Sequence, residues 1–204
     1  MSLHEEIEAD LWKWIHEFVT VPNEFYNNKF APCPYAYLAV KTNAVDVVAW
    51  ESGDVRQFIR EKGVGMRDAP NLTTRVMAFP PRTQFAWGIS EFVEELNREL
   101  IPDNVFLNTG IAKTTKSLYP NSGDSPYFIV VANSLAAVLD GAESLAKSDY
   151  YKDWPKEHYE IVVERRARMA KRYGKKNETG EKGEKPNLVK QAEQAKQAKQ
   201  AKKK

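Results

Sequence analysis

The chain has 204 residues, of which 42% are hydrophobic and 11% aromatic, which fits one globular domain with a full core. No run reaches the roughly 18 apolar residues of a membrane span, the acidic N-terminus is unlike a signal peptide, and one cysteine excludes an internal disulfide or a multi-thiolate metal site. The net charge of +2 is uneven, because residues 171–204 carry +8 and residues 1–170 carry −6; we expect a cytosolic protein without a membrane partner.

The first half of the chain predicts two helices and two strands. Ser2-Leu-His-Glu5 has the form of a capping box, and the apolar positions that follow recur at helical spacing up to Pro22. Residues 45–50 are typical of a buried strand, residues 52–62 of a short helix ended by Gly63, and residues 73–79 of a β-branched strand.

The second half predicts three helices and two strands. Ser90 is the expected N-cap of a helix that ends before Pro102 and buries an apolar face formed by Phe92, Val93, Leu96 and Leu100. Residues 105–112 and 127–133 predict strands, the latter central because it is almost continuously apolar. Helices follow from Ser134 and from near Pro155. This order predicts an α+β (or α/β) two-layer sandwich with about four strands in a mixed sheet.

The character of the sequence changes after Tyr173. Residues 174–186 contain no apolar side chain, and residues 191–202 repeat Gln-Ala-Lys-like triplets whose three-residue period leaves no stripe to bury in a helix. We therefore predict a single domain over residues 1–173 and a flexible basic tail, rich in Lys, Ala and Gln, over residues 174–204.

The stretch NKFAPCPYAY contains the only cysteine, Cys33, between two prolines and among aromatic residues. A free cysteine in such company is commonly a small buried apolar residue. A reactive thiol would instead need a cation, a helix N-terminus or a histidine beside it, and His16 is the histidine nearest in sequence. Both interpretations stay open, and the second makes Cys33 and His16 candidate catalytic residues.

The loop KTTKSLYPNSGDSP, residues 113–126, is long for a connection between two strands. Its hydroxyl groups and two lysines could bind an anionic ligand, although Pro-Asn-Ser-Gly-Asp is also ordinary turn chemistry. The candidate ligand-binding residues at this loop are Lys113, Lys116, Ser122, Asp124, Ser125 and Tyr127.

Basic residues end the last predicted helix and continue into the tail. Cations at the C-terminal end of a helix interact favourably with the helix dipole. The same residues could also bind nucleic acid or another polyanion in a salt-sensitive, sequence-independent way. The alternative is a tail that only keeps the protein soluble. The candidate polyanion-binding residues are Arg165, Arg166, Arg168, Lys171, Arg172, Lys175, Lys176, Lys196, Lys199, Lys202, Lys203 and Lys204.

No motif indicates a metal or a cofactor. The three histidines, His4, His16 and His158, are too scattered to be metal ligands, and Gly63-Val-Gly65 lacks the third glycine of a dinucleotide-binding loop. We expect neither.

Two short sequence motifs resemble motifs of a bacterial family of uncharacterised proteins, domain of unknown function 1415. Cys33-Pro-Tyr-Ala36 is similar to the Cys-Pro-Phe-Ala motif of that family, and residues 121–127 are similar to its Asn-containing loop with Ser-Pro-Tyr. The resemblance covers about residues 1–155 and implies that Cys33 and the 121–127 loop lie at one site. Phe79-Pro80 stands where the family pattern has His-Pro, so this chain lacks that histidine.

The sequence thus predicts a soluble binding or accessory protein whose basic tail contacts nucleic acid or another polyanion. The alternative is a small thiol-dependent enzyme or redox protein that uses Cys33 with His16 and the 113–126 loop.

Overall fold

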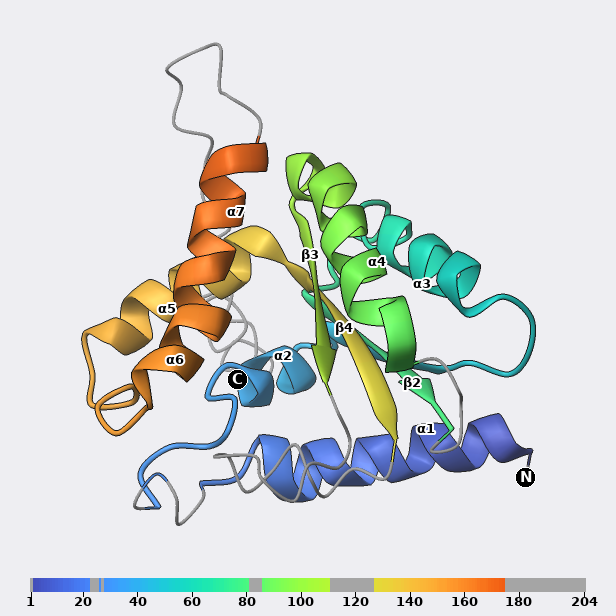
Figure 1. Ribbon diagram of the computed structural model, residues 1–204. Helices are drawn as coiled ribbons and strands as arrows, with labels where there is room; N and C mark the ends of the chain where they lie inside the picture. Colours follow the sequence, from blue (N-terminus) through green and yellow to red (C-terminus); the bar gives the residue numbers. More distant parts are fainter. Residues whose placement is uncertain (1, 23–25, 27, 81–85, 111–126, 175–204) are drawn as a thin grey trace, which may run out of the picture. The chain divides into compact units, whose positions relative to one another are not determined.

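The computed structural model describes residues 2–22, 26, 28–80, 86–110 and 127–174 (Figure 1). The chain divides into two units, Met1–Gly174 and Lys175–Lys204, and all described residues belong to the first.

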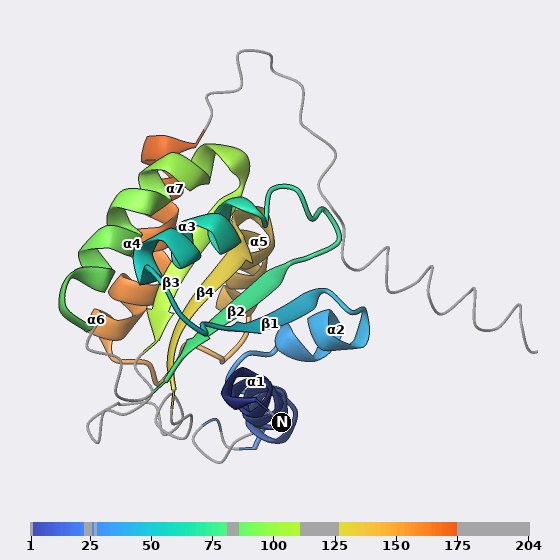
Figure 2. The same cartoon turned by 90° about the vertical axis from the view of Figure 1, so that its right-hand side faces the viewer.

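The centre of this unit is a four-stranded mixed sheet. Its strands are β1 (Val45–Ala49), β2 (Thr74–Phe79), β3 (Val105–Gly110) and β4 (Phe128–Ser134). They lie side by side in the order β1-β2-β4-β3 (Figure 2). The β1–β2 pair is parallel, whereas β4 runs antiparallel to both of its neighbours, β2 and β3. The predicted α+β class with a four-stranded mixed sheet is therefore confirmed, and β4 is central as its apolar sequence predicted.

Helices flank this sheet and are named here in the order of the chain. They are α1 (Leu3–Trp14), which continues as a π-helical turn (Ile15–Val19), α2 (Ala36–Lys41), α3 (Val55–Val64), α4 (Ala86–Leu100), which continues as a 3-10 turn (Ile101–Asp103), α5 (Leu135–Ala146), α6 (Lys156–Tyr159), a second π-helical turn (Glu160–Glu164) and α7 (Arg165–Tyr173). At the start of α1, the Ser2 backbone N–H donates to Glu5 Oε2 at 2.7 Å, so the predicted capping box is present.

Helices cover both faces of the sheet. In β2 and β4, the residues that point to one face and those that point to the other are both largely apolar. Met77 and Phe79 pack with α3 and α4 in the largest core cluster. Val76 and Ala78 pack with α1 on the opposite face, and Phe106 of β3 packs there with residues of α5 and α7. In Figure 1, α3 and α4 lie to the right of the strands, α5, α6 and α7 to the left, and α1 beneath them. The second helical face adds a third layer to the two that the sequence predicted.

Helix α4 begins at Ala86, four residues before the predicted cap. Ser90 lies inside the helix and not at its N-terminus, so that prediction is wrong. The reason is the apolar face, which starts earlier than expected: Ile89 is buried in line with Val93, Leu96 and Leu100. No helix among the described residues is long and apolar enough to cross a membrane.

Candidate functional site

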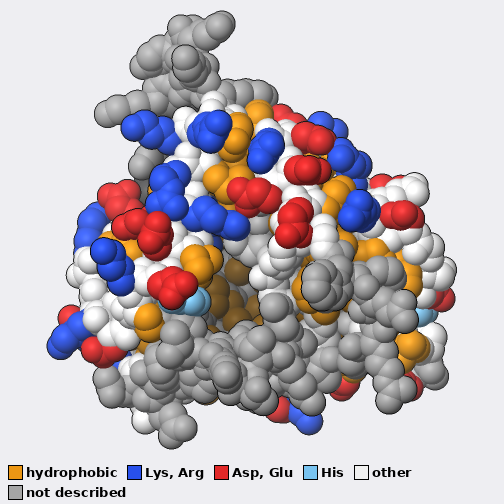
Figure 3. Space-filling model, in the orientation of Figure 1, with side chains coloured by type: hydrophobic (Ala, Val, Ile, Leu, Met, Phe, Trp, Pro, Cys, Tyr) orange, Lys and Arg blue, Asp and Glu red, His pale blue; other side chains and the backbone are white. Residues whose placement is uncertain are grey.

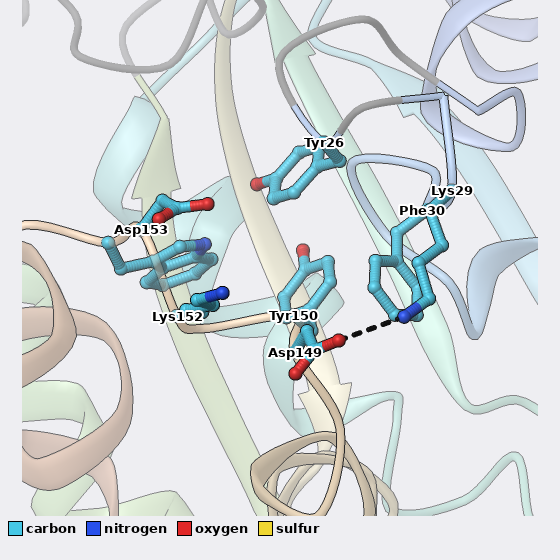
Figure 4. Close-up of a pocket in the computed structure, with 8 residues that line it drawn as sticks. Tyr26, Lys29, Phe30, Asp149, Tyr150, Lys152 and Asp153 are labelled. Carbon is cyan, nitrogen blue, oxygen red and sulfur yellow. Dashed lines mark hydrogen bonds and ion pairs between the residues drawn. The ribbon is translucent and has the colours of Figure 1, made fainter.

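A small aromatic pocket lies where the segment after α1 meets the connection between α5 and α6. Its volume is about 110 Å³. Its walls come from two stretches that are far apart in sequence: Tyr26, Lys29 and Phe30 on one side, and Asp149, Tyr150, Lys152, Asp153 and Trp154 on the other. In Figure 4, Tyr150 stands in the middle of the lining residues, with Phe30 and Lys29 on one side and Asp153 on the other.

Two buried tyrosines form the apolar floor of the pocket. The rings of Tyr26 and Tyr150 stack with their centroids 4.9 Å apart and their planes 5° from parallel, and Phe30 meets Tyr150 edge-on at 5.5 Å. The Tyr150 hydroxyl donates to the backbone oxygen of Pro32 at 2.5 Å. Burial raises the pKa of both tyrosines, so both hydroxyl groups stay protonated at neutral pH.

The rim of the pocket carries charges of both signs. Lys29 Nζ lies 3.0 Å from Asp149 Oδ2 and also lies over the Phe30 ring, 5.2 Å from its centroid. This pairing lowers the pKa of Asp149, because the lysine hydrogen-bonds to the carboxylate and attracts its charge. Lys152 and Asp153 are exposed at the same rim. The pocket therefore combines aromatic walls with polar groups at its mouth.

The aromatic cluster extends beyond the pocket towards α6. Trp154 contacts Tyr150 at 5.5 Å, Tyr151 at 4.8 Å and the His158 ring at 4.7 Å, and Tyr151 meets Tyr159 at 5.2 Å. These ring contacts, three of them edge-to-face, hold the 149–159 segment together although it contains only one helical turn. Burial lowers the pKa of His158 in this surrounding.

Cys33 lies next to this cluster, in a loop that is held from three sides. The Cys33 backbone N–H donates to the Val19 oxygen at 3.2 Å, and the Tyr150 hydroxyl donates to the oxygen of the preceding residue, Pro32. The ring of the nearby Tyr35 packs against Gly141 of α5. A Cβ atom at Gly141 would come within 3.1 Å of that ring, so glycine permits the close approach.

Cys33 is an exposed residue whose thiol has a raised pKa. The residue is exposed, yet the protein around it is dense enough that burial raises the pKa of its thiol. The thiol pKa stays raised although three smaller influences lower it: the backbone N–H groups of Ala36 and Tyr35 and the charge of Arg166. Cys33 is thus neither a fully buried core residue nor an activated thiolate.

His16, the predicted base for this thiol, lies on the π-helical turn after α1. Its exposed ring stacks on Trp12, with centroids 5.8 Å apart. Among the described residues, the His16 side chain contacts Trp12 and has no hydrogen bond to Cys33. The structure therefore supplies no hydrogen bond that would activate the thiol through His16.

Most of the predicted ligand-binding loop lies outside the described residues. The predicted binding residues in that part are Lys113, Lys116, Ser122, Asp124 and Ser125. Tyr127 is described, and its hydroxyl donates to Asp10 Oδ2 of α1 at 2.7 Å. Burial, this hydrogen bond and the negative charge of Asp10 raise the pKa of Tyr127 to about 12. Tyr127 thus ties the start of β4 to α1.

The basic residues of α7 differ in their partners. Figure 3 shows Lys and Arg side chains over α7 with carboxylates among them. Arg165 pairs with Glu94 at 3.0 Å, and Arg168 lies 3.5 Å from Glu164 and 3.8 Å from Glu160. Within the described part of the chain, Lys171 and Arg172 have no carboxylate partner, and Arg172 lies over the Tyr173 ring. The predicted residues Lys175, Lys176, Lys196, Lys199 and Lys202–Lys204 lie outside the described residues.

Sequence reasoning missed the aromatic pocket. Its one local signal is the stretch Asp149-Tyr-Tyr-Lys-Asp-Trp154, where three aromatic side chains and three charged ones stand together between two predicted helices. Such a stretch outside regular structure is typical of a functional loop.

Over the described residues, no three His, Cys, Asp or Glu side chains come together as a metal site would require. Comparison of the chain with known protein families, with curated proteins and with solved structures finds no significant match. The resemblance to the domain of unknown function 1415 therefore stays a prediction, as does a shared site of Cys33 and the 121–127 loop.

Proposed function

We propose that this protein is a binding protein that holds a small ligand with a single planar ring in its aromatic pocket. The observation that carries the proposal is the convergence of Tyr26, Phe30, Tyr150 and Trp154 around one cavity. Aromatic walls with a few polar groups at the mouth are typical of small-molecule sites.

The size of the pocket bounds the ligand. An apolar cavity of roughly 150 Å³ accepts benzene, so a pocket of about 110 Å³ that opens to solvent suits one ring-sized group. Stacking and edge contacts with the walls would stabilise the ring. The Lys29–Asp149 pair, with Lys152 and Asp153, would meet a polar substituent at the mouth.

Fluorine NMR of the protein labelled with 5-fluorotryptophan tests this proposal. The chain has five tryptophans, and Trp154 is the one in the pocket. We expect a set of phenols, indoles and benzoates to include compounds that shift the Trp154 resonance, assigned with Trp154→Phe, and leave the other resonances in place. Phe30→Ala should weaken this binding, whereas Tyr37→Ala, which removes an exposed ring outside the pocket, should not. Binding that is equal in both variants would contradict the proposal.

A second function is polyanion binding by the C-terminal end of α7 together with residues 175–204. It is favoured by Lys171 and Arg172, whose charges no described carboxylate neutralises, and by the ten further lysines that follow them in sequence. Lysine contacts with phosphates release counterions, so such binding would weaken steeply with salt.

Retention on a heparin column and binding to single-stranded DNA at several salt concentrations test the second function. Removal of residues 175–204 should abolish salt-dependent binding. The double variant Lys171→Gln, Arg172→Gln should reduce the slope of log K against log salt by up to about two. Arg168→Gln removes a cation that already lies near two carboxylates, so it should change the slope less. An unchanged slope in the truncated protein would refute polyanion binding.

A further inference from the structure

The charged groups at the mouth of the aromatic pocket are of two kinds. Lys29 and Asp149 neutralise each other, because Lys29 Nζ lies 3.0 Å from Asp149 Oδ2. Lys152 and Asp153 line the same pocket and are exposed, and among the described residues their side chains form no ion pair or hydrogen bond. The charge of Lys152 helps to lower the pKa of Asp149, but less than Lys29, which bonds to that carboxylate. Beside a closed ion pair, the mouth therefore offers a cation and an anion that are both open to a ligand.

A tight turn places these two open charges next to each other. The Trp154 backbone N–H donates to the Tyr151 oxygen at 3.1 Å, so Lys152 and Asp153 are the central residues of a four-residue turn. Consecutive Cα atoms lie about 3.8 Å apart, so the two side chains start from neighbouring points. Figure 4 shows both of them on the same side of Tyr150. A ligand at this part of the mouth meets both charges at once.

Two open charges of opposite sign discriminate against a ligand with a single charge. A carboxylate would be attracted to Lys152 and repelled by Asp153, and an ammonium group would meet the reverse. A ligand that carries both groups is attracted to both side chains and leaves neither without a counter-charge. The Lys29–Asp149 pair has no net charge, so it does not alter this preference.

We propose that the ligand of the aromatic pocket is an aromatic α-amino acid, a proposal that rests on the ring-binding function above and specifies the polar end of the ligand. The ring lies among Tyr26, Phe30 and Tyr150, in a space of about 110 Å³ that holds one ring and leaves the rest of the ligand at the mouth. There Asp153 binds the ammonium group and Lys152 binds the carboxylate. An α-amino acid carries these two groups on one carbon atom, which suits two charges on neighbouring residues.

A matched set of compounds with the same ring and carbon chain tests the role of each charge. Phenylalanine carries both groups, phenethylamine lacks the carboxylate, and hydrocinnamate lacks the ammonium group. Their affinities are measured from the fluorine resonance of Trp154 in the protein labelled with fluorotryptophan. We expect phenylalanine to bind at least about threefold more tightly than either of the others, because an exposed charge pair contributes modestly to affinity.

Single substitutions assign each charge to its side chain. Lys152→Gln should weaken the binding of phenylalanine and hydrocinnamate about threefold and should not weaken that of phenethylamine. Asp153→Asn should weaken the binding of phenylalanine and phenethylamine and should not weaken that of hydrocinnamate. The matched control is Lys156→Gln, which removes an exposed lysine outside the pocket and should leave all three affinities unchanged.

The outcomes separate the class of ligand from the ring-binding function. If phenethylamine or hydrocinnamate binds as tightly as phenylalanine, or if Lys152→Gln and Lys156→Gln have equal effects, the ligand is not an amino acid, although the pocket still binds rings. The same holds if none of these compounds shifts the Trp154 resonance while a phenol, indole or benzoate does. If no ring compound shifts that resonance, the ring-binding function is wrong as well.

Discussion

The side chain of Asn97 on α4 forms hydrogen bonds with both backbone polar groups of Leu107 on β3. Its amide nitrogen donates to the Leu107 oxygen at 3.0 Å, and its amide oxygen accepts from the Leu107 N–H at 2.7 Å. Both residues are fully buried. Because β3 is an edge strand, these backbone groups have no neighbouring strand, and Asn97 replaces the missing one.

Replacement of Asn97 by alanine should be strongly destabilising. It leaves a buried N–H and a buried C=O without partners, at about 1–3 kcal/mol each, so we expect the free energy of unfolding to fall by about 2–5 kcal/mol. Urea unfolding followed by circular dichroism measures this change. Asn133→Ala, which removes one partly buried bond to Thr74, should cost about 1 kcal/mol. Equal losses in the two variants would show that Asn97 does not stabilise the edge of the sheet.

The hydroxyl of Tyr150 anchors the loop that carries Cys33. Tyr150→Phe keeps the stacked ring and removes the hydroxyl, with its hydrogen bond to the Pro32 oxygen and its hydrogen bond with the Tyr26 side chain, so the free energy of unfolding should fall by at least about 1 kcal/mol. Alkylation of Cys33 should become faster, because the loop loses one of its attachments. Tyr37→Phe removes an exposed hydroxyl that accepts from Lys41 and should change neither quantity. An unchanged alkylation rate in Tyr150→Phe would mean that the other attachments suffice.

The strands and most helices could be predicted because their signals are local. Residues 73–79 are β-branched and bounded by prolines, and β2 occupies Thr74–Phe79. The first helix was predicted from its capping box, which the Ser2–Glu5 bond confirms. The prediction that Ser90 is an N-cap was wrong because a serine is acceptable inside a helix when the apolar face continues through Ile89.

The candidate sites could not be predicted in the same way, because their parts are distant in sequence. The stack of Tyr26 on Tyr150 and the hydrogen bond from Tyr150 to Pro32, beside Cys33, depend on how the segment after α1 packs against the segment after α5. Hydrophobic periodicity gives the faces of elements and not which loops meet. The same limit applied to strand order, which depends on the pairing of β2 with β4 across a long stretch of chain.

The Cys33 thiol should ionise at a higher pH than a free cysteine. Burial raises its pKa, and the raised value means that the thiolate forms only at more alkaline pH. The rate of iodoacetamide alkylation against pH should therefore have a midpoint above that of N-acetylcysteine measured alongside. Arg166→Gln should move the midpoint further up, since the charge of Arg166 favours the thiolate. A midpoint below that of the free thiol would instead support the activated thiol of the enzyme alternative.

His158 should make the protein less stable as the pH falls. Burial lowers its pKa in the folded state, so the unfolded chain binds the proton more readily. The stability that neutral His158 contributes is fully present above the unfolded-state pKa of roughly 6.5 and is lost as the pH falls through that value towards the lower folded-state pKa. The free energy of unfolding, measured with urea between about pH 7 and pH 5, should therefore decrease.

His158→Gln isolates this contribution, because the variant should have a flatter pH dependence whatever its overall stability. His16→Gln, which removes an exposed imidazole outside the aromatic cluster, is the control variant. Glu99 and Asp149, whose pKa values are lowered by hydrogen bonds from Arg60 and Lys29, lose their contributions only at more acidic pH, so they leave this window clear. Parallel pH curves for His158→Gln and the unaltered protein would show that the imidazole is as easily protonated in the aromatic cluster as in the unfolded chain.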